Sequence, residues 1–454
     1  MAVNNLPASL QSIIQLGFLE EEFRKPLRAR LGFRALAERE PFRASIGETI
    51  TKTRTGLLPA ITTPMAPAAN TDFTSGLTPQ NYAVEQYTLG IQQYSGNMML
   101  NVVTSRVAIA EQFLLNASQL GEQAMRSVDI LAQQNLFNAY LGGQTRVTTT
   151  LGAAGTVVHV DDIRGFQQTI NTEGQVVPVS SSFPVNVTVG SDTYSLVGAA
   201  ADGTNTSTAP GGISGNLTFA TNVTVADGTA GNAVISSVAG VIVRPSTGNV
   251  PLTSAMAQTT AAISTNQFNS GRLSMQMILA AKAQLELNHV PPARDGMYIL
   301  YADPQHLTGL YQDPAFQYFF RGRPDTAEYR QGVVAEQLGV RVEWTNLNPV
   351  QTLSGVGVVR RAFLGGMGAL VEGEFSAEGY RGVNDADLDD DQITMVDGIA
   401  HIVREPLDAL RQVVTQSWSY IGGFVAPTDY TTNPTTIPTA SYAAYKRGAI
   451  IESL

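Results

Sequence analysis

The sequence predicts an α+β protein made of regions with different patterns. Residues 105–141 repeat apolar side chains at three- and four-residue steps, as in a long amphipathic helix. Residues 145–255 are rich in Thr, Val, Gly, Ser and Asn and alternate as short strands. Residues 271–375 mix an amphipathic helix with short apolar strands. A chain of 454 residues is long enough for two or three domains.

The composition indicates a protein that meets other protein over much of its surface. Hydrophobic residues make up 43% of the chain and charged residues 15%, against an average of about 25% charged. The net charge of −10 excludes a general nucleic-acid signature. The absence of Cys excludes disulfides and zinc–thiolate sites and fits synthesis in a reducing cytosol. We expect neither a signal peptide nor a membrane span.

Residues 1–55 have the pattern of an arm and hold the basic stretch of an acidic chain. Seven basic residues lie between Arg24 and Arg43, and Glu38 and Glu40 oppose them. Either a polyanion or acidic neighbours would suit this charge, and a solvated helix with local ion pairs is the alternative. We take Arg28, Arg30 and Arg34 as candidate contact residues.

Residues 50–100 predict a loop followed by a strand or a two-stranded ribbon. The prolines of "TPMAPAANTDFTSGLTP" break helices and strand ladders alike, and "NYAVEQYTLGIQQYSG" alternates in part. A long two-stranded excursion is not stable alone, so we expect it to lie on its own chain or on a neighbour.

The helix over 105–141 is the clearest element. Its apolar stripe includes Phe113, Leu120 and Val128, no Pro interrupts it, and Gly142–Gly143 ends it. A coiled coil is the competing interpretation. The strands of 145–255 then predict a small β-sandwich or a barrel-like domain.

The last third of the chain returns to mixed structure. Asp303–Pro304 and Asp313–Pro314 each have the pattern of an N-cap followed by Pro at the first helical position. Residues 392–454 predict strands, then the aromatic stretch "QSWSYIGGF", then a Pro- and Thr-rich tail.

A search for catalytic and ligand-binding patterns predicts no enzyme. The sequence contains no phosphate-binding loop, no His-Glu-x-x-His and no Gly-x-Ser-x-Gly. The four histidines lack ligand spacing, and "NDADLDDD" at 384–391 lacks the Gly and distal Glu of a calcium loop. We therefore predict no catalytic, cofactor-binding or metal site.

Three stretches, in this order, resemble the major capsid proteins of tailed bacteriophages, which share the Hong Kong 97-type (Johnson) fold. They are "DGMYILYADPQHLTGLYQDPAFQYFFRGR" (295–323), "LGVRVEWTN" (338–346) and "REPLDALRQVVTQSWSYIGGF" (404–424). With the arm, the extended loop and the long helix before them, the resemblance covers about three quarters of the chain.

The resemblance implies a division of the chain. It makes 1–50 an N-terminal arm, 51–104 an extended β-loop, 105–144 the spine helix of a peripheral domain, 256–375 an axial domain, and 376–454 peripheral strands with a tail. Residues 145–255 become an inserted β-rich domain, Ig-like or a sandwich. Trp418, Tyr420 and Phe424 would supply apolar area where copies meet, and Gly422–Gly423 would permit close approach.

The implied function is a shell subunit that forms hexamers and pentamers around double-stranded DNA, without sequence specificity and without a membrane. Portal and scaffolding proteins, and in some members a decoration protein, would be its partners in a virion made in the host bacterial cytoplasm. An encapsulin-like nanocompartment shell and a secreted adhesin with a β-sandwich domain are the alternatives.

Overall fold

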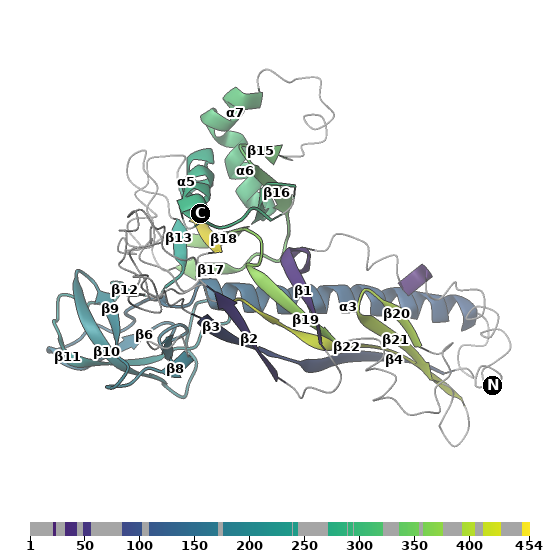
Figure 1. The fold of residues 1–454 in the computed structure, drawn as a ribbon, viewed down its shortest axis with the longest axis horizontal. Coiled ribbons are helices and arrows are strands. Elements are labelled where there is room, and N and C mark those ends of the chain that lie inside the picture. Colours follow the sequence, from purple (N-terminus) through teal and green to yellow (C-terminus); the bar gives the residue numbers. More distant parts are fainter. Residues whose placement is uncertain are drawn as a thin grey trace, which may run out of the picture. The chain divides into compact units, whose positions relative to one another are not determined.

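The computed structural model divides the chain into two units. It describes residues 21–23, 32–42, 49–55, 84–101, 109–170, 176–237, 239–243, 271–287, 289–293, 295–320, 336–353, 357–375, 393–404, 412–427 and 447–454. One unit comprises 1–51, 88–135 and 370–425, and the other comprises 52–87, 136–369 and 426–454. Helices and strands are mixed in both (Figure 1), so the predicted α+β class is confirmed.

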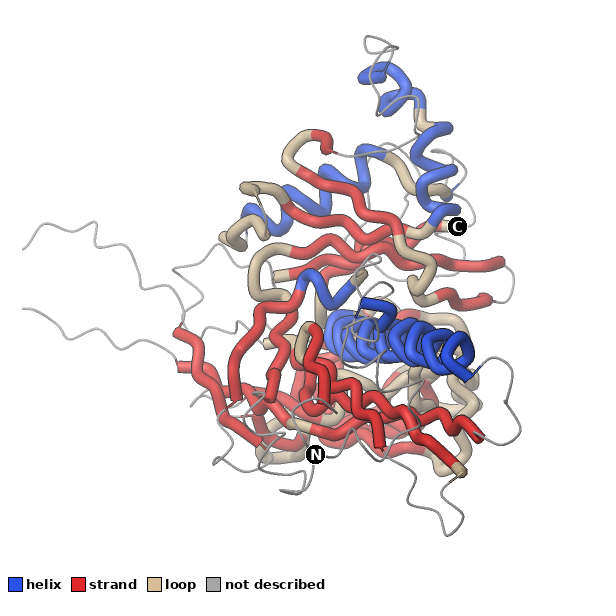
Figure 2. Tube along the Cα trace, turned by 90° about the vertical axis from the view of Figure 1, so that its right-hand side faces the viewer, coloured by secondary structure: helices blue, strands red, loops and turns tan. Residues whose placement is uncertain are grey.

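The first unit, called here the open unit, packs a long helix on an open sheet. The helix is α3 (Ile109–Tyr140), of which residues up to 135 belong to this unit. The described strands run β1-β19-β22-β21-β20, with β4 also on β22. Their bounds are β1 Ala37–Phe42, β4 Gln92–Asn101, β19 Leu370–Phe375, β20 Ile393–Val396, β21 Ile399–Arg404 and β22 Val413–Val425. Figure 2 views α3 nearly end-on, with these strands along one side of it.

The period of α3 explains why it lies on this sheet. The buried positions Phe113, Ala117, Leu120, Ala124 and Val128 form one stripe, and the sheet meets that side of the helix. The Gln416 side chain of β22 donates to the main-chain carbonyl of Phe113 at 3.0 Å. The predicted long helix is thus confirmed, and among the described residues its partner is a sheet rather than a second helix.

Two short elements accompany the open sheet. The 3-10 helix η2 (Phe33–Leu36) leads into β1, which pairs parallel to β19. The strands β2 (Thr49–Thr55) and β3 (Val84–Gly90) form a two-stranded ribbon that pairs with no third strand of the described residues. This ribbon is the excursion that the sequence predicts over 50–100.

The second unit contains a small closed barrel. Its described strands run β5-β12-β9-β10-β11-β6, and the chain after β5 bonds back to β6, with Val147 bridging Val160 and the amide of Thr148 donating to the carbonyl of His159 at 2.9 Å. The bounds are β5 Gln144–Arg146, β6 Gly155–Val160, β9 Val185–Val189, β10 Asp192–Ala201, β11 Gly215–Val223 and β12 Ala233–Ser236, with the side hairpin β7 Gln168–Ile170 and β8 Val176–Pro178. The sheet therefore closes on itself, as in the barrel-like form that the sequence also predicts for this region rather than in an Ig-like sandwich.

Strict alternation fills the barrel. In β9, "VNVTV", the three Val side chains are buried while Asn186 and Thr188 face outward. Tyr194 and Phe219 meet edge-on inside, with ring centroids 5.9 Å apart. The barrel strands end at Ser236, short of the boundary predicted at 255, because the next strand, β13 (Val241–Val243), pairs with β23 in another sheet.

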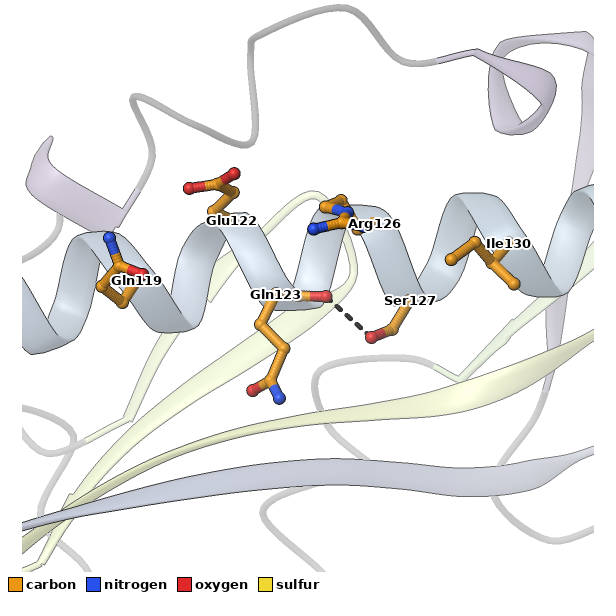
Figure 3. Close-up of a pocket in the computed structure, with 6 residues that line it drawn as sticks. All are labelled: Gln119, Glu122, Gln123, Arg126, Ser127 and Ile130. Atoms are coloured by element: carbon orange, nitrogen blue, oxygen red, sulfur yellow. Dashed lines mark hydrogen bonds between the residues drawn. The ribbon is translucent and has the colours of Figure 1, made fainter. Parts of the chain in front are cut away.

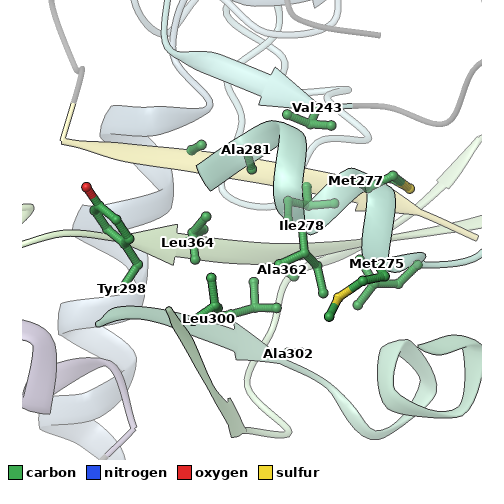
Figure 4. Packing of buried hydrophobic residues seen from close by; sticks show 14 of the residues in the cluster. Val243, Met275, Met277, Ile278, Ala281, Tyr298, Leu300, Ala302, Ala362 and Leu364 are labelled. Carbon is green, nitrogen blue, oxygen red and sulfur yellow. The ribbon is translucent and has the colours of Figure 1, made fainter. Parts of the chain in front are cut away.

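That other sheet is the core of the predicted axial region. Its described strands run β13-β23-β18-β14-β16-β15, with β17 on β18. The bounds are β14 Tyr298–Ala302, β15 Glu336–Gln337, β16 Val340–Trp344, β17 Val350–Leu353, β18 Gly357–Gly365 and β23 Gly448–Ser453, with helices α5 Met275–Leu287, α6 Pro304–Gln312 and α7 Pro314–Phe320. Figure 4 shows Met275, Ile278 and Ala281 of α5 packed on Leu300 and Leu364.

Buried polar contacts join the barrel to this sheet. The Gln351 side chain of β17 donates to Asp161 at 3.3 Å and to Thr208 at 2.9 Å, and both acceptors belong to barrel loops. Arg361 of β18 also bonds Gln351 and pairs with Glu452 at 3.0 Å. The barrel is thereby held to the sheet at a defined point.

Candidate assembly surfaces

The side chain of Arg34 is buried in the open unit, where it holds the N-terminal segment to the sheet. Its guanidinium donates to Glu372 of β19 at 2.7 and 2.9 Å and to the main-chain carbonyl of Asp397 at 2.8 Å. The exposed fractions of Arg34 and Glu372 are 2% and 0%. Burial opposes the charge of Arg34, but Glu372 and Asp397 outweigh it and raise the pKa of Arg34. Arg34 is therefore a permanent cation inside its own chain.

Asp129 of α3 completes this attachment. Its carboxylate accepts the amide of Arg34 at 3.0 Å, at the start of η2. A Cβ on Gly32 would lie 2.7 Å from the same carboxylate, so a larger residue there would displace the Asp129 side chain. Burial raises the pKa of Asp129, and the amides of Arg34 and Phe33 partly offset that rise. The chain from residue 32 onward is thus fixed to both the helix and the sheet.

The aromatic residues predicted for contacts between copies lie along β22. Trp418 donates from Nε1 to Gln123 of α3 at 3.0 Å, and the Tyr420 hydroxyl donates to Glu372 at 2.9 Å. Phe424 stacks on Tyr420, with ring centroids 6.3 Å apart. The exposed fractions of these three residues are 2%, 0% and 8%.

The burial of these side chains leaves a second copy little of them to touch. Arg34 and the three aromatics pack within one chain, and their role at contacts between copies stays a prediction that a single chain does not test. Arg28 and Arg30 lie outside the described residues, as does the acidic stretch 384–391.

The two glycines after the aromatic stretch permit close approach inside the chain. A Cβ on Gly423 would lie 1.9 Å from the main-chain oxygen of Gly90, and one on Gly422 would lie 2.5 Å from the Tyr420 hydroxyl. Both glycines therefore permit close approach within the chain, and the close approach predicted between copies stays a prediction.

His401 of β21 is a buried base that the sequence did not single out. Its exposed fraction is 1%, and neither ring nitrogen has a hydrogen-bond partner in the described part of the chain. The ring of Phe23 lies against it, with centroids 4.6 Å apart. Burial lowers the pKa of His401 to about 4, so the ring is neutral at pH 7.

The exposed side of α3 carries a shallow hollow of about 330 Å³. Figure 3 shows its lining along one face of the helix: Gln119, Glu122, Gln123, Arg126, Ser127 and Ile130. The Ser127 hydroxyl donates to the carbonyl of Gln123 one turn earlier, at 2.7 Å. These six lining residues include no nucleophile paired with a base.

The described residues hold no metal-binding group and no membrane helix. No three His, Asp or Glu side chains among them are close enough to share a metal ion. None of the helices within the described ranges is both long enough and apolar enough to cross a bilayer.

Comparison with known proteins gives structural likenesses alone. No family model and no curated protein matches the chain. The capsid of Ralstonia phage GP4 is 13% identical with a TM-score of 0.46, over 92% of this chain and 87% of that chain. The capsid structure of the cyanophage P-SCSP1u is 10% identical with a TM-score of 0.47, over 93% of this chain and 88% of that chain.

A third structure, the capsid asymmetric unit of cyanophage Pam1, is 11% identical with a TM-score of 0.43, over 94% of this chain and 93% of that chain. All three are capsid structures of phages. At these identities the likeness concerns the fold and carries no residue's role to this chain.

Proposed function

We propose that this chain is a major capsid protein of a tailed phage, which self-assembles into hexamers and pentamers of an icosahedral shell around double-stranded DNA. The ribbon of β2 and β3 is the observation that carries the proposal. It pairs with no third described strand, and a two-stranded ribbon in water is marginal by itself. A shell supplies the neighbouring copy on which such a ribbon can lie.

The rest of the architecture supports the same function. The ribbon, the long helix on an open sheet and the later α/β sheet follow one another in the order that the sequence resemblance implies. The described residues contain no catalytic constellation that would favour an enzyme instead. Portal, scaffolding and decoration proteins are the partners of such a subunit, and the virion, assembled in the host cytoplasm, is its place.

The basic arm is the part we assign to DNA or to acidic neighbours. Arg34 is buried against Glu372, so its side chain is not placed to contact DNA. Arg28 and Arg30 remain as the candidate contact residues. Contact with DNA by such residues is independent of sequence and sensitive to salt. Replacing Arg28 and Arg30 by Gln should lower DNA retention as salt rises, and unchanged retention would favour a solvated helix.

The barrel is assigned to the outer surface. Its strands and loops contain two basic residues other than His, and both are paired: Arg146 with Asp161 at 3.8 Å and Arg164 with Asp162 at 2.7 Å. A surface without free cations is poorly suited to DNA. Protease added to intact particles should therefore cut barrel loops before the arm.

Negative-stain microscopy of the purified protein tests the main proposal, with shells as the expected result. Deleting residues 60–78, between β2 and β3, should leave soluble subunits and weaken the shells. Wild-type yield and thermal stability of shells from that variant would contradict the role of the ribbon.

A further inference from the structure

The inference concerns the buried ring of His401 and the N-terminal turn that covers it. His401 lies within β21 with an exposed fraction of 1%. Neither nitrogen of the ring has a hydrogen-bond partner in the described part of the chain. A buried polar group without a partner costs free energy, and a buried charge without one costs more. The ring is therefore tolerated only while it is neutral.

The strands on both sides of β21 surround the ring with uncharged side chains. His401 lies opposite Trp418 of β22 and opposite Thr394 of β20. The sequences of these strands, "ITMV" for β20 and "VVTQSWSYIGGFV" for β22, contain no charged residue. The indole of Trp418 is already bonded to Gln123 of α3. The two neighbouring strands therefore provide no anion for a protonated ring.

The ring of Phe23 covers His401. The two ring centroids lie 4.6 Å apart with an angle of 31° between the planes, and the exposed fraction of Phe23 is 0%. Phe23 belongs to a helical turn, residues 21–23. In this turn Glu21 is exposed and Glu22 is partly exposed, and neither accepts a hydrogen bond from the imidazole. The contact between the turn and the histidine is thus one of two rings without an ion pair.

The other charged residues of the elements around His401 are bonded elsewhere or exposed. Asp397, in the turn before β21, pairs with Arg34 at 3.3 Å and with Arg39 at 2.7 Å. Asp129 of α3 accepts the amide of Arg34 at 3.0 Å. The remaining charged residues of β21 and α3 are exposed: Arg404, Glu111, Glu122 and Arg126. Among the described residues, a proton on His401 would therefore meet no bonded anion.

We propose that His401 and Phe23 form an acid-sensitive switch, in which a proton on the imidazole releases residues 21–23 from the sheet. A charged ring requires water, and the short turn is the part of its cover that can leave without breaking strand pairs. β21 pairs along its whole length with β22 and also pairs with β20. The chain from residue 32 onward stays attached through the buried pair of Arg34 with Glu372. This inference goes beyond the proposed function and does not depend on it.

The direction of the switch follows from the pKa of His401 in the two forms. In the covered form burial lowers this pKa from 6.5 to about 4, and release of the turn restores the ordinary value. The released form therefore binds the proton first as the pH falls, so acid favours release and neutral pH favours the covered form. Between about pH 7.5 and about pH 4.5, the ratio of released to covered chains should rise roughly seventyfold.

A spin label on the turn tests this proposal in the full chain. The chain has no Cys, so Glu21→Cys provides one labelling site on residues 21–23. We expect the electron paramagnetic resonance spectrum of this label to become more mobile between pH 7.5 and pH 4.5. The same label on Glu122→Cys of α3 should not change. A label on the turn that stays immobile at pH 4.5, or equal mobilisation of both labels, would overturn the proposal.

Substitutions of the two rings separate a switch from a structural role. His401→Leu cannot take up a proton, so the label at residue 21 should stay immobile at pH 4.5, whereas His159→Leu, at an exposed position of β6, should keep the response. Phe23→Ala removes the ring contact and should mobilise the label already at pH 7.5, which gives a second test if His401→Leu does not fold by circular dichroism. A full pH response in His401→Leu, or an immobile label in Phe23→Ala, would contradict the proposal.

Discussion

The barrel and the open unit differ in their sheet edges: the barrel sheet is closed, whereas the sheet of the open unit ends in edge strands. In the barrel, the contact of Val147 with Val160 closes the strands into a ring, so every strand has two neighbours and the apolar side chains face one interior. Among the described strands, the sheet of the open unit ends at β1 and β20, and β4 pairs with β22 alone. The barrel is therefore stabilised by contacts within its own segment of the chain, whereas the open unit relies on a buried ion pair, Arg34 with Glu372.

The largest expected effect comes from cutting the barrel open. A fragment of residues 143–240 should melt cooperatively as a β-rich monomer, as followed by circular dichroism. A fragment of residues 157–245 lacks β5 and the closing contact of Val147, and it should lose the cooperative transition. Equal melting temperatures of the two fragments would show that closure of the sheet contributes nothing to the stability of the barrel.

In the open unit, the largest effect should come from Arg34. Arg34→Met removes the buried cation of Glu372 and leaves it only the partly exposed Arg39, whose Nε lies 3.6 Å from the carboxylate. Breaking a buried pair costs roughly 3–5 kcal/mol of unfolding free energy. The comparison is Arg39→Met, whose partly exposed side chain pairs with Asp397 at 2.7 Å and lies 3.6 Å from Glu372. Arg34 remains on Glu372 in that variant, so the loss should be smaller, about 1 kcal/mol. Chemical denaturation measures both, and similar losses would remove the distinction between a buried and a surface pair.

Acid should weaken the open unit first, through His401. Its folded pKa of about 4 lies below the ordinary 6.5, so the unfolded chain binds the proton first as the pH falls. Stability is complete above about pH 6.5 and should fall by about 3 kcal/mol by pH 4. His401→Leu should remove this dependence in urea titrations, and the same slope in that variant would exclude His401 as its source.

The barrel should respond to acid later and less, through Asp227. Burial alone would raise the pKa of Asp227, but bonds from Tyr194 at 2.6 Å, Ser191 and Thr224 lower it to about 2. Its contribution is present above about pH 4 and should fall by about 2 kcal/mol as the pH drops toward 2. Asp227→Asn in the isolated barrel should flatten the pH profile of its melting temperature. A barrel that loosens before the open unit would reverse the comparison.

Local patterns could be predicted from the sequence because short-range chemistry decides them. The helix expected over 105–141 is found over Ile109–Tyr140. The spacing of its apolar residues and the pair Gly142–Gly143 after it determine the helix over one or two turns of chain. Asp303 caps α6 as predicted, accepting the amide of His306 at 2.7 Å. The alternation of "VNVTV" likewise fixed which side chains fill the barrel.

Long-range pairing could not be predicted. Arg34 stands in a basic stretch, where an exposed guanidinium is the reasonable expectation, and its partner Glu372 lies 338 residues away. The closure of the barrel depends on one bridge, Val147 to Val160, that has no sequence signature.

The two ends of the barrel meet, and this has a consequence for the history of the gene. The amide of Ser236 donates to the carbonyl of Gly143 at 2.8 Å, and the Gln144 side chain donates to the carbonyl of Gly240. A coding segment that begins and ends at one point in space can be lost, gained or exchanged by recombination while the flanking strands keep their places. The sequence of the barrel can therefore diverge faster than the sequence of the strands and helices that flank it.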